Sequence, residues 1–112
     1  MPIQLSERAR DGGTFAVTVA FDDEGNDPVT PSAVTWTLLN RENQVINNRD
    51  AVPATPCASV TVVLGADDLR YADGDIRHVV FDWTYDSSLG SGLTGREQVT
   101  FVISDIREKA TG

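Results

Sequence analysis

Residues 15–21 read Phe-Ala-Val-Thr-Val-Ala-Phe, and this stretch decides the fold class. Its large apolar side chains fall on odd positions, with small or polar side chains between them. In an extended strand successive side chains point to opposite faces, so the pattern predicts a strand with one buried face. The same alternation recurs at 34–38, 60–64, 79–85 and 99–103. Alternation alone therefore predicts five strands.

Weaker signals predict two further strands, at residues 3–8 and 44–47. The segment 50–56 holds two prolines, which cannot donate to a hydrogen-bond ladder, so we predict loop or sheet edge there. Residues 65–71 lose the alternation and carry two aspartates near their start, which favours a single helical turn.

About seven strands at spacings near ten residues, with no helix between them, predict an antiparallel sandwich or barrel. Trp36 stands on the third predicted strand, where an immunoglobulin-like sandwich places its central core aromatic. The helical turn falls between the fifth and sixth strands, which fits the same layout. We therefore predict an all-β, immunoglobulin-like two-sheet sandwich in which the third, sixth and seventh strands share a sheet. The cysteine pair of antibody domains is missing, so only the architecture transfers.

The chain has 112 residues, close to the modal size of one domain, so we predict a single domain over 1–112 with flexible ends at about 1–2 and 107–112. The lone Cys57 excludes an internal disulfide, and its apolar neighbours predict a buried, inert thiol. The net charge of −8 argues against nucleic acid as a ligand, because phosphate binding needs clustered Lys and Arg. We find no apolar run long enough for a signal peptide or a transmembrane helix, so we expect synthesis in a cytoplasm and no membrane partner.

The pattern of chemically active residues predicts no enzyme and no cofactor. His78, the only histidine, lies mid-strand on the face opposite Val79, so we predict that it points outward. A nucleophile turn of the Gly-x-Ser-x-Gly kind is absent. The acidic turn at 22–27 is a candidate calcium site, but its residue order departs from the spaced calcium loop, and a solvated turn is favoured. Residues 90–95 hold three glycines but lack the lysine of a phosphate loop, so we predict a long hairpin loop joining the last two strands.

The predicted outer faces differ between the two sheets. The second and fifth strands direct small, mostly polar side chains outward, as expected for a face open to water. The third, sixth and seventh strands direct aliphatic side chains outward, and such patches often mark partner surfaces, although scattered surface aliphatics need no explanation. The two leucines of the glycine-rich loop either fold back on the sandwich or anchor a neighbour. The candidate partner interface comprises Leu39, Ile76, His78, Val80, Val102, Leu89 and Leu93.

The stretch 15–25, a proline-containing linker and the stretch 31–38 together resemble the small immunoglobulin-like accessory proteins of tailed bacteriophages. Those proteins occur on heads, at head–tail joints and in tails. The resemblance covers most of the chain through strand patterning and turn chemistry. It implies a virion structural protein without catalytic residues, whose partners are capsid, connector or tail subunits or further copies of itself. The alternative is a binding module for carbohydrate or a cell-surface ligand, which is weakened because alternation leaves only Tyr71 and Tyr85 to stack on a sugar.

Overall fold

The computed structural model describes residues 3–10, 12–71 and 74–104. The ends predicted to be flexible, 1–2 and 107–112, lie outside these residues. In chain order the described elements are β1 (Ile3–Arg10), β2 (Thr14–Ala20), β3 (Ala33–Leu39), β4 (Val52–Ala54), β5 (Ser59–Gly65), the 3₁₀ helix η1 (Ala66–Leu69), β6 (Ile76–Ser87) and β7 (Gly90–Ser104).

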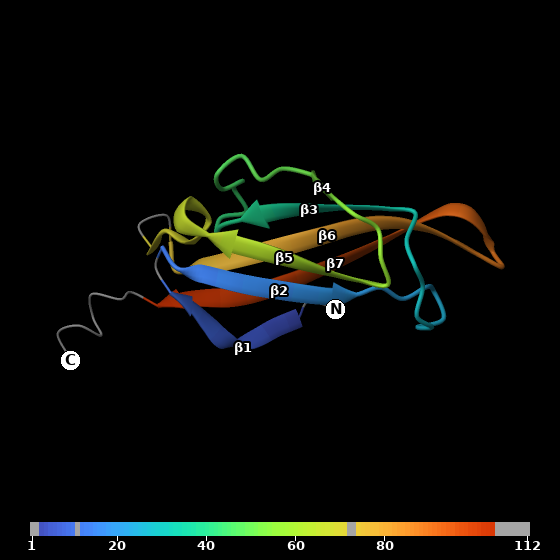
Figure 1. The fold of residues 1–112 in the computed structure, drawn as a ribbon, viewed down its shortest axis with the longest axis horizontal. Helices are drawn as coiled ribbons and strands as arrows, with labels where there is room; N and C mark the ends of the chain where they lie inside the picture. The colour runs from blue at the N-terminus through green and yellow to red at the C-terminus, as the bar shows by residue number, and fades with distance from the viewer. Residues whose placement is uncertain (1–2, 11, 72–73, 105–112) are drawn as a thin grey trace.

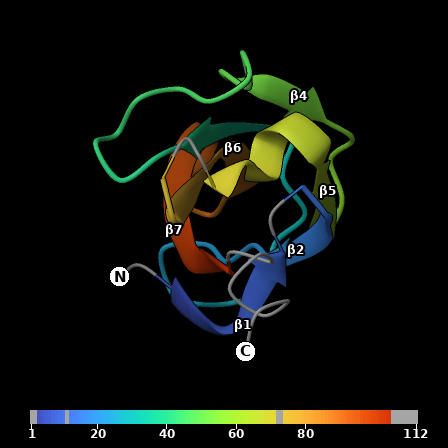
Figure 2. The same cartoon turned by 90° about the vertical axis from the view of Figure 1, so that its left-hand side faces the viewer.

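The strands form a five-stranded sheet, in the order β1-β7-β6-β3-β4, and a two-stranded sheet of β2 and β5. The two-stranded sheet lies in front in Figure 1, and the end-on view of Figure 2 shows the strands curling around one interior. The all-β prediction and the grouping of β3, β6 and β7 in one sheet are confirmed. The expectation of purely antiparallel pairing is wrong, because β1 runs parallel to β7, with Ile3 opposite Val99. A parallel pair needs a long connection, and here the whole intervening chain supplies it.

The inner-facing side chains of both sheets form one core. Each long strand buries alternate residues, so the predicted inner faces are confirmed. Ring pairs join the two sheets, with centroids 4.6 Å apart for Phe15 and Phe101 and 4.9 Å apart for Phe21 and Trp83. Apolar burial supplies most of the stability of such a core, and tilted ring pairs add to it. The buried apolar residues are Ala9, Val17, Val19, Phe21, Val34, Trp36, Leu38, Ile46, Val60, Val62, Leu64, Leu69, Val79, Phe81, Trp83, Tyr85, Val99, Phe101 and Ile103.

The strand predicted at 44–47 is wrong. Only Val45 forms a bridge there, a single one with Leu39. Asn47 follows in the left-handed region (φ 53°), which an extended strand does not use. The fourth strand is instead β4, inside the segment predicted as loop or sheet edge, and its position at the edge tolerates Pro53.

The long glycine-rich loop predicted at 90–95 is also wrong. Its first residue opens β7, which pairs with β6 as far as Ser87, so only two residues form the turn. Gly95 lies opposite Trp83, whose ring is so close that an added Cβ would be 2.4 Å from it. The indole therefore fills the space of the missing side chain and keeps a glycine-rich segment in register. We call residues 82–97 the ribbon; Figure 1 shows it extending past the end of the two-stranded sheet.

The buried thiol predicted at Cys57 is a further error. Cys57 is exposed and lies in the irregular segment that precedes β5. The apolar strand begins only at Ser59, because Pro56 cannot contribute a backbone donor to a ladder. Cys57 and its immediate neighbours in the sequence therefore lie outside the core.

The single helical turn predicted within 65–71 is confirmed as η1. Behind it lies Arg77, a fully buried residue on β6. Its Nε donates to the carbonyl oxygen of Asp68 at 3.0 Å, Nη2 to that of Arg70 at 2.7 Å, and Nη1 to that of Gly74 at 2.9 Å. A buried guanidinium needs many acceptors, and the irregular backbone around η1 supplies them. This arrangement ties the segment between β5 and β6 to the sheet.

Candidate interaction surface

The outward face of β3, β6 and β7 brings five of the predicted interface residues together. Leu39 lies opposite His78, and Ile76 lies opposite Val102. Val80 occupies the middle strand, between a threonine of β3 and a glutamine of β7. All five side chains are half-buried by their neighbours on the face.

A polar cluster interrupts the aliphatic side chains on this face. His78 Nδ1 lies 2.8 Å from Thr100 Oγ1 and 3.3 Å from Gln98 Nε2. Gln98 Nε2 also donates to Thr100 Oγ1 at 3.3 Å. Burial lowers the pKa of His78, so the imidazole is neutral at pH 7. The prediction that His78 points away from the core is confirmed, but its immediate surroundings are polar.

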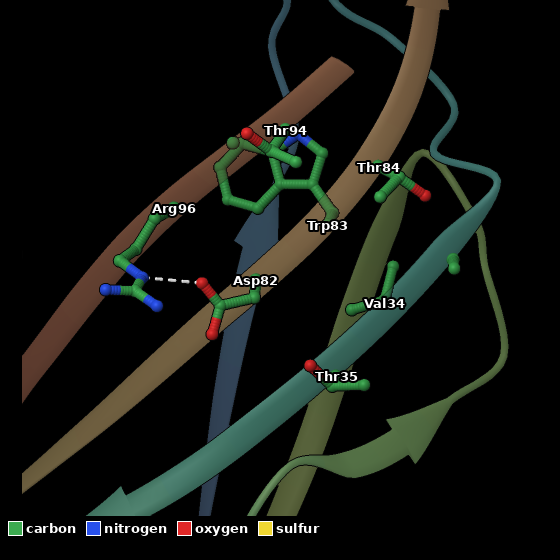
Figure 3. A pocket seen from close by; sticks show the side chains of 9 residues that line it. Val34, Thr35, Asp82, Trp83, Thr84, Thr94 and Arg96 are labelled. Carbon is green, nitrogen blue, oxygen red and sulfur yellow. Dashed lines mark hydrogen bonds and ion pairs between the residues drawn. The ribbon is translucent and has the colours of Figure 1, made fainter. Parts of the chain in front are cut away.

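An ion pair marks the ribbon end of the same face. Arg96 Nε and Asp82 Oδ1 are 2.6 Å apart and bridge β7 and β6, as Figure 3 shows. Beside this pair is the outer hollow, a shallow depression of about 430 Å³ whose lining includes Thr35, Thr84 and Thr94. The aliphatic part of the face therefore ends where the charged and hydroxyl-bearing part begins.

The two predicted anchors in the ribbon lie in different environments. Leu93 is opposite Tyr85 and packs against the core from the inner side. Leu89 is in the turn and is 71% exposed. Leu93 therefore folds back on the sandwich, whereas Leu89 projects away from it. Neither shares the face with the other five predicted interface residues.

The inner side of the ribbon borders a second, larger depression, which we call the inner hollow. It has a volume of about 710 Å³ and is lined by Thr18, Val19, Ala20, Asp22, Asp23, Glu24, Asn26, Trp83, Tyr85, Thr94, Gly95, Arg96 and Glu97. Glu24 Oε1 accepts hydrogen bonds from Tyr85 Oη at 3.0 Å and from Ser87 Oγ at 3.1 Å. Burial, together with the hydrogen bond and charge of Glu24, raises the pKa of Tyr85. The acidic turn is thus fastened to the ribbon.

The acidic turn itself is held by internal hydrogen bonds. Asp23 Oδ1 accepts from the backbone N–H groups of Gly25 at 2.8 Å and Asp27 at 3.1 Å. Such a side-chain-to-backbone arrangement is a common way for aspartate to stabilise a turn. Within 3–10, 12–71 and 74–104, no three His, Cys, Asp or Glu side chains are grouped so that they would hold a metal ion.

Both hollows are lined by Trp83, Thr94, Gly95 and Arg96, and sequence patterning identified none of these four as site residues. Trp83 was recognised only as an inward-facing core residue. Its Nε1 is buried and has no hydrogen-bond partner in the part of the chain that the structure describes. The sequence pattern could not predict that Trp83 pairs with Gly95 across the strands, because it predicts a loop at 90–95.

Comparison with known proteins identified no matching family model, no matching curated protein and no matching solved structure. Among the described residues, no helix has the length and apolar character needed to cross a membrane.

Proposed function

We propose that this chain is a non-enzymatic structural protein of a tailed-phage virion, either a head-associated decoration protein or a head–tail accessory subunit. It docks on capsid, connector or tail subunits through the outward face of β3, β6 and β7. The observation that carries the proposal is the position of Leu39, Ile76, Val80 and Val102 on one sheet face. Aliphatic side chains gathered on an outer face often mark a partner surface.

The proposal includes an immunoglobulin-like fold, which the strand order supports. The order β7-β6-β3-β4 corresponds to strands G, F, C and C′ of a variable-type sandwich, and β2-β5 corresponds to B and E. Trp36 on β3 takes the place of the central core tryptophan of strand C. Sandwiches of this kind serve many functions, so the function is argued from the surface.

A contrast between the two outer faces favours the β3-β6-β7 face. Most outward side chains of β2 and β5 are small, such as Ala16, Thr18 and Thr61, and a direct hydrogen bond of 2.8 Å joins the two threonine hydroxyls. That face has one large apolar residue, Val63, which is 64% exposed. The aromatic side chains that a sugar site would use are largely committed to the core, which favours a protein partner over a carbohydrate.

The first test asks whether the chain belongs to a particle. Particles produced by the source genome would be purified on a density gradient and their proteins identified by mass spectrometry. We expect the chain in the particle fraction, at a fixed ratio to the major capsid or tail protein. Its absence from every particle fraction overturns the virion proposal.

The second test asks whether the named face makes the contact. Purified protein would be added back to particles that lack it, and binding measured by co-sedimentation. The double variant Val80→Lys/Val102→Lys is expected to bind at least about tenfold more weakly, because charges would have to be buried in an apolar contact. Val63→Lys, the same change on the opposite sheet, is the matched control and should bind as wild type. Equal binding by the double variant and the control would exclude this face.

A further inference from the structure

The inner hollow is bounded by two strands from different sheets. The C-terminal end of β2 contributes Thr18 and Ala20, and the ribbon part of β7 contributes Thr94 and Arg96. Its volume of about 710 Å³ is in the range of ligand-binding sites. The directions of the backbone N–H and C=O groups of these four residues indicate what kind of ligand the hollow can bind.

On the β7 side the ladder leaves backbone groups unpaired. The N–H of Ile103 donates to the carbonyl of Asp75 at 2.7 Å, and the register is regular from there to Tyr85 opposite Leu93. Hydrogen-bonded positions alternate along an antiparallel strand. Odd-numbered residues of β7 therefore bond to β6, and even-numbered residues direct their N–H and C=O groups to the opposite edge. β1 covers that edge only from Val99 onward. Among the described residues, the backbone N–H and C=O groups of Thr94 and Arg96 therefore lack a strand partner.

The β2 side has the same property. The N–H of Ala66 donates to the carbonyl oxygen of Gly13, and the N–H of Phe21 donates to the carbonyl oxygen of Ala58. These bonds bracket the β2–β5 ladder and assign the odd-numbered residues of β2 to β5. Thr18 and Ala20 therefore direct their backbone groups away from β5, on the side where they line the hollow.

The charge of the lining restricts the occupant further. Asp22, Asp23, Glu24 and Glu97 line the hollow, against one cation, Arg96, which is already paired with Asp82 outside it. A segment with a Lys or Arg side chain is attracted to this lining, whereas an acidic one is repelled. Trp83, 8% exposed and with its Nε1 unpartnered among the described residues, forms part of the same wall.

We propose that the inner hollow binds an extended, basic segment of a partner protein, which adds as a strand to the free edge of β7. The backbone groups of Thr94 and Arg96 hydrogen-bond to the segment, and its cationic side chain lies against Asp22 and Glu97. Strand addition of this kind draws affinity from main-chain hydrogen bonds and specificity from the side-chain sites beside them. This site uses the backbone edge of β7 and not the outward aliphatic side chains of β3, β6 and β7, so it stands or falls independently of the proposed function.

The test uses two synthetic peptides, capped and about nine residues long, made of threonine and valine with either lysine or glutamate at the centre. Binding to the ¹⁵N-labelled protein would be followed by NMR. We expect the lysine peptide to shift the amide signals of Thr94 and Arg96 and the indole signal of Trp83 saturably. The glutamate peptide should bind at least about tenfold more weakly. No saturable shift with the lysine peptide, or equal affinity for both peptides, overturns the proposal.

A proline substitution separates strand addition from surface attraction. Thr94→Pro removes an N–H that faces the free edge and leaves the ladder to β6 intact, so the lysine peptide should bind about tenfold more weakly. Val63→Pro makes the same change on β5, where odd-numbered residues face away from β2, and should leave the affinity unchanged, because Val63 lies opposite Ala16, outside the hollow. Full affinity in a folded Thr94→Pro variant contradicts the proposal. Should Thr94→Pro fail to fold, Asp22→Asn/Glu97→Gln replaces it, and retention of the preference for lysine over glutamate overturns the proposal.

Discussion

At the residue scale, the carboxylate of Asp68 joins η1 to residues 47–49, a segment that is distant in sequence. It is 1% exposed and accepts hydrogen bonds from Asn47 Nδ2 at 2.9 Å, Arg49 Nε at 3.0 Å and the N–H of Gly65 at 3.2 Å. The guanidinium carbon of Arg49 also lies 5.7 Å from the centre of the Trp36 ring. Cation–π contact and hydrogen bonding together hold the irregular segment before β4 against the core. This network, and not a strand at 44–47, fixes the conformation of that segment.

Replacing Asp68 is expected to lower the free energy of unfolding more than replacing its exposed neighbour Asp67. Asp68→Asn removes a buried charge and leaves Arg49 and Asn47 with poorer acceptors, so we expect a loss of about 2–3 kcal/mol in the free energy of unfolding. Asp67, whose carboxylate pairs with Arg70 at the surface, provides the control Asp67→Asn, with an expected loss below about 0.5 kcal/mol. Urea titration followed by circular dichroism measures both. Equal effects of the two substitutions would contradict a structural role for Asp68.

The pH dependence of this effect follows from the pKa of Asp68. Burial alone would raise that pKa, but the hydrogen bonds from Arg49, Asn47 and Gly65, with the charge of Arg49, hold it below its usual value. The unfolded chain therefore takes up the proton first as the pH falls. The stabilisation is present above about pH 4 and is lost as the pH falls through the lowered pKa. The unfolding free energies of wild type and Asp68→Asn should converge below about pH 4, and a constant difference at lower pH would argue against the ion pair.

Gly95 is the second residue whose surroundings lead to a direct prediction. An added Cβ would lie 2.4–2.7 Å from three atoms of the Trp83 indole, so Gly95→Ala must displace the ring. Overpacking of this kind costs about 1–3 kcal/mol. At Gly25 the nearest atom to an added Cβ is 3.5 Å away, so Gly25→Ala is expected to be close to neutral and serves as control. The midpoints of thermal unfolding of the two variants test this prediction. An unchanged midpoint for Gly95→Ala would mean that the indole does not pack on this residue.

At the element scale, alternation predicted the strands that have one buried and one exposed face. It failed where pairing does not depend on that pattern. β4 has three residues and a proline, so it carries no alternation, and it exists because the edge of β3 is available to it. At the start of β7, Gly95 is covered by the Trp83 ring, a contact between strands that local sequence cannot encode, whereas Gly90 and Gly92 have positive φ. The buried position of Arg77 fits the alternation of β6, but its charge gave no reason to place it in the core.

Hydrogen exchange tests the ribbon as an element. If residues 93–97 form a ladder with β6, the amides of Leu93, Gly95 and Glu97 are protected, and those of Thr94 and Arg96 exchange faster because they face an open edge. Beyond Val99, where β1 covers that edge, protection should become continuous. NMR-detected exchange resolves both patterns. Uniformly fast exchange over 93–97 would restore the interpretation of this segment as a loop.

At the scale of the whole molecule, the fold class and the inward and outward faces of the strands were accessible from sequence, because one periodic pattern determines both. The division into sheets followed from the immunoglobulin-like layout that Trp36 and the helical turn indicate. The candidate site was only partly accessible. Five of the seven predicted interface residues share a face, but the polar contacts of His78 within it and the inner hollow depend on register, which alternation does not specify. Register therefore limits how far a β protein's surface can be derived from its sequence.

One core that spans both sheets predicts a single cooperative unfolding transition. Trp83 lies in the ribbon and packs on Phe21, and Trp36 lies opposite Phe81, two residues from Trp83 along β6, so tryptophan fluorescence reports on the core where the ribbon begins. Circular dichroism reports on all the strands, from the ribbon end to the η1 end. In a domain of this size the two ends should unfold together. Gly95→Ala, at the ribbon end, and Asp68→Asn, at the η1 end, are each expected to move the fluorescence and circular dichroism midpoints by the same amount. If Gly95→Ala moved only the fluorescence midpoint, the ribbon would be a separate unit that opens before the sandwich. Strand addition at β7 would then have to order the ribbon as well as pair with it, which would weaken binding by the free energy of that ordering.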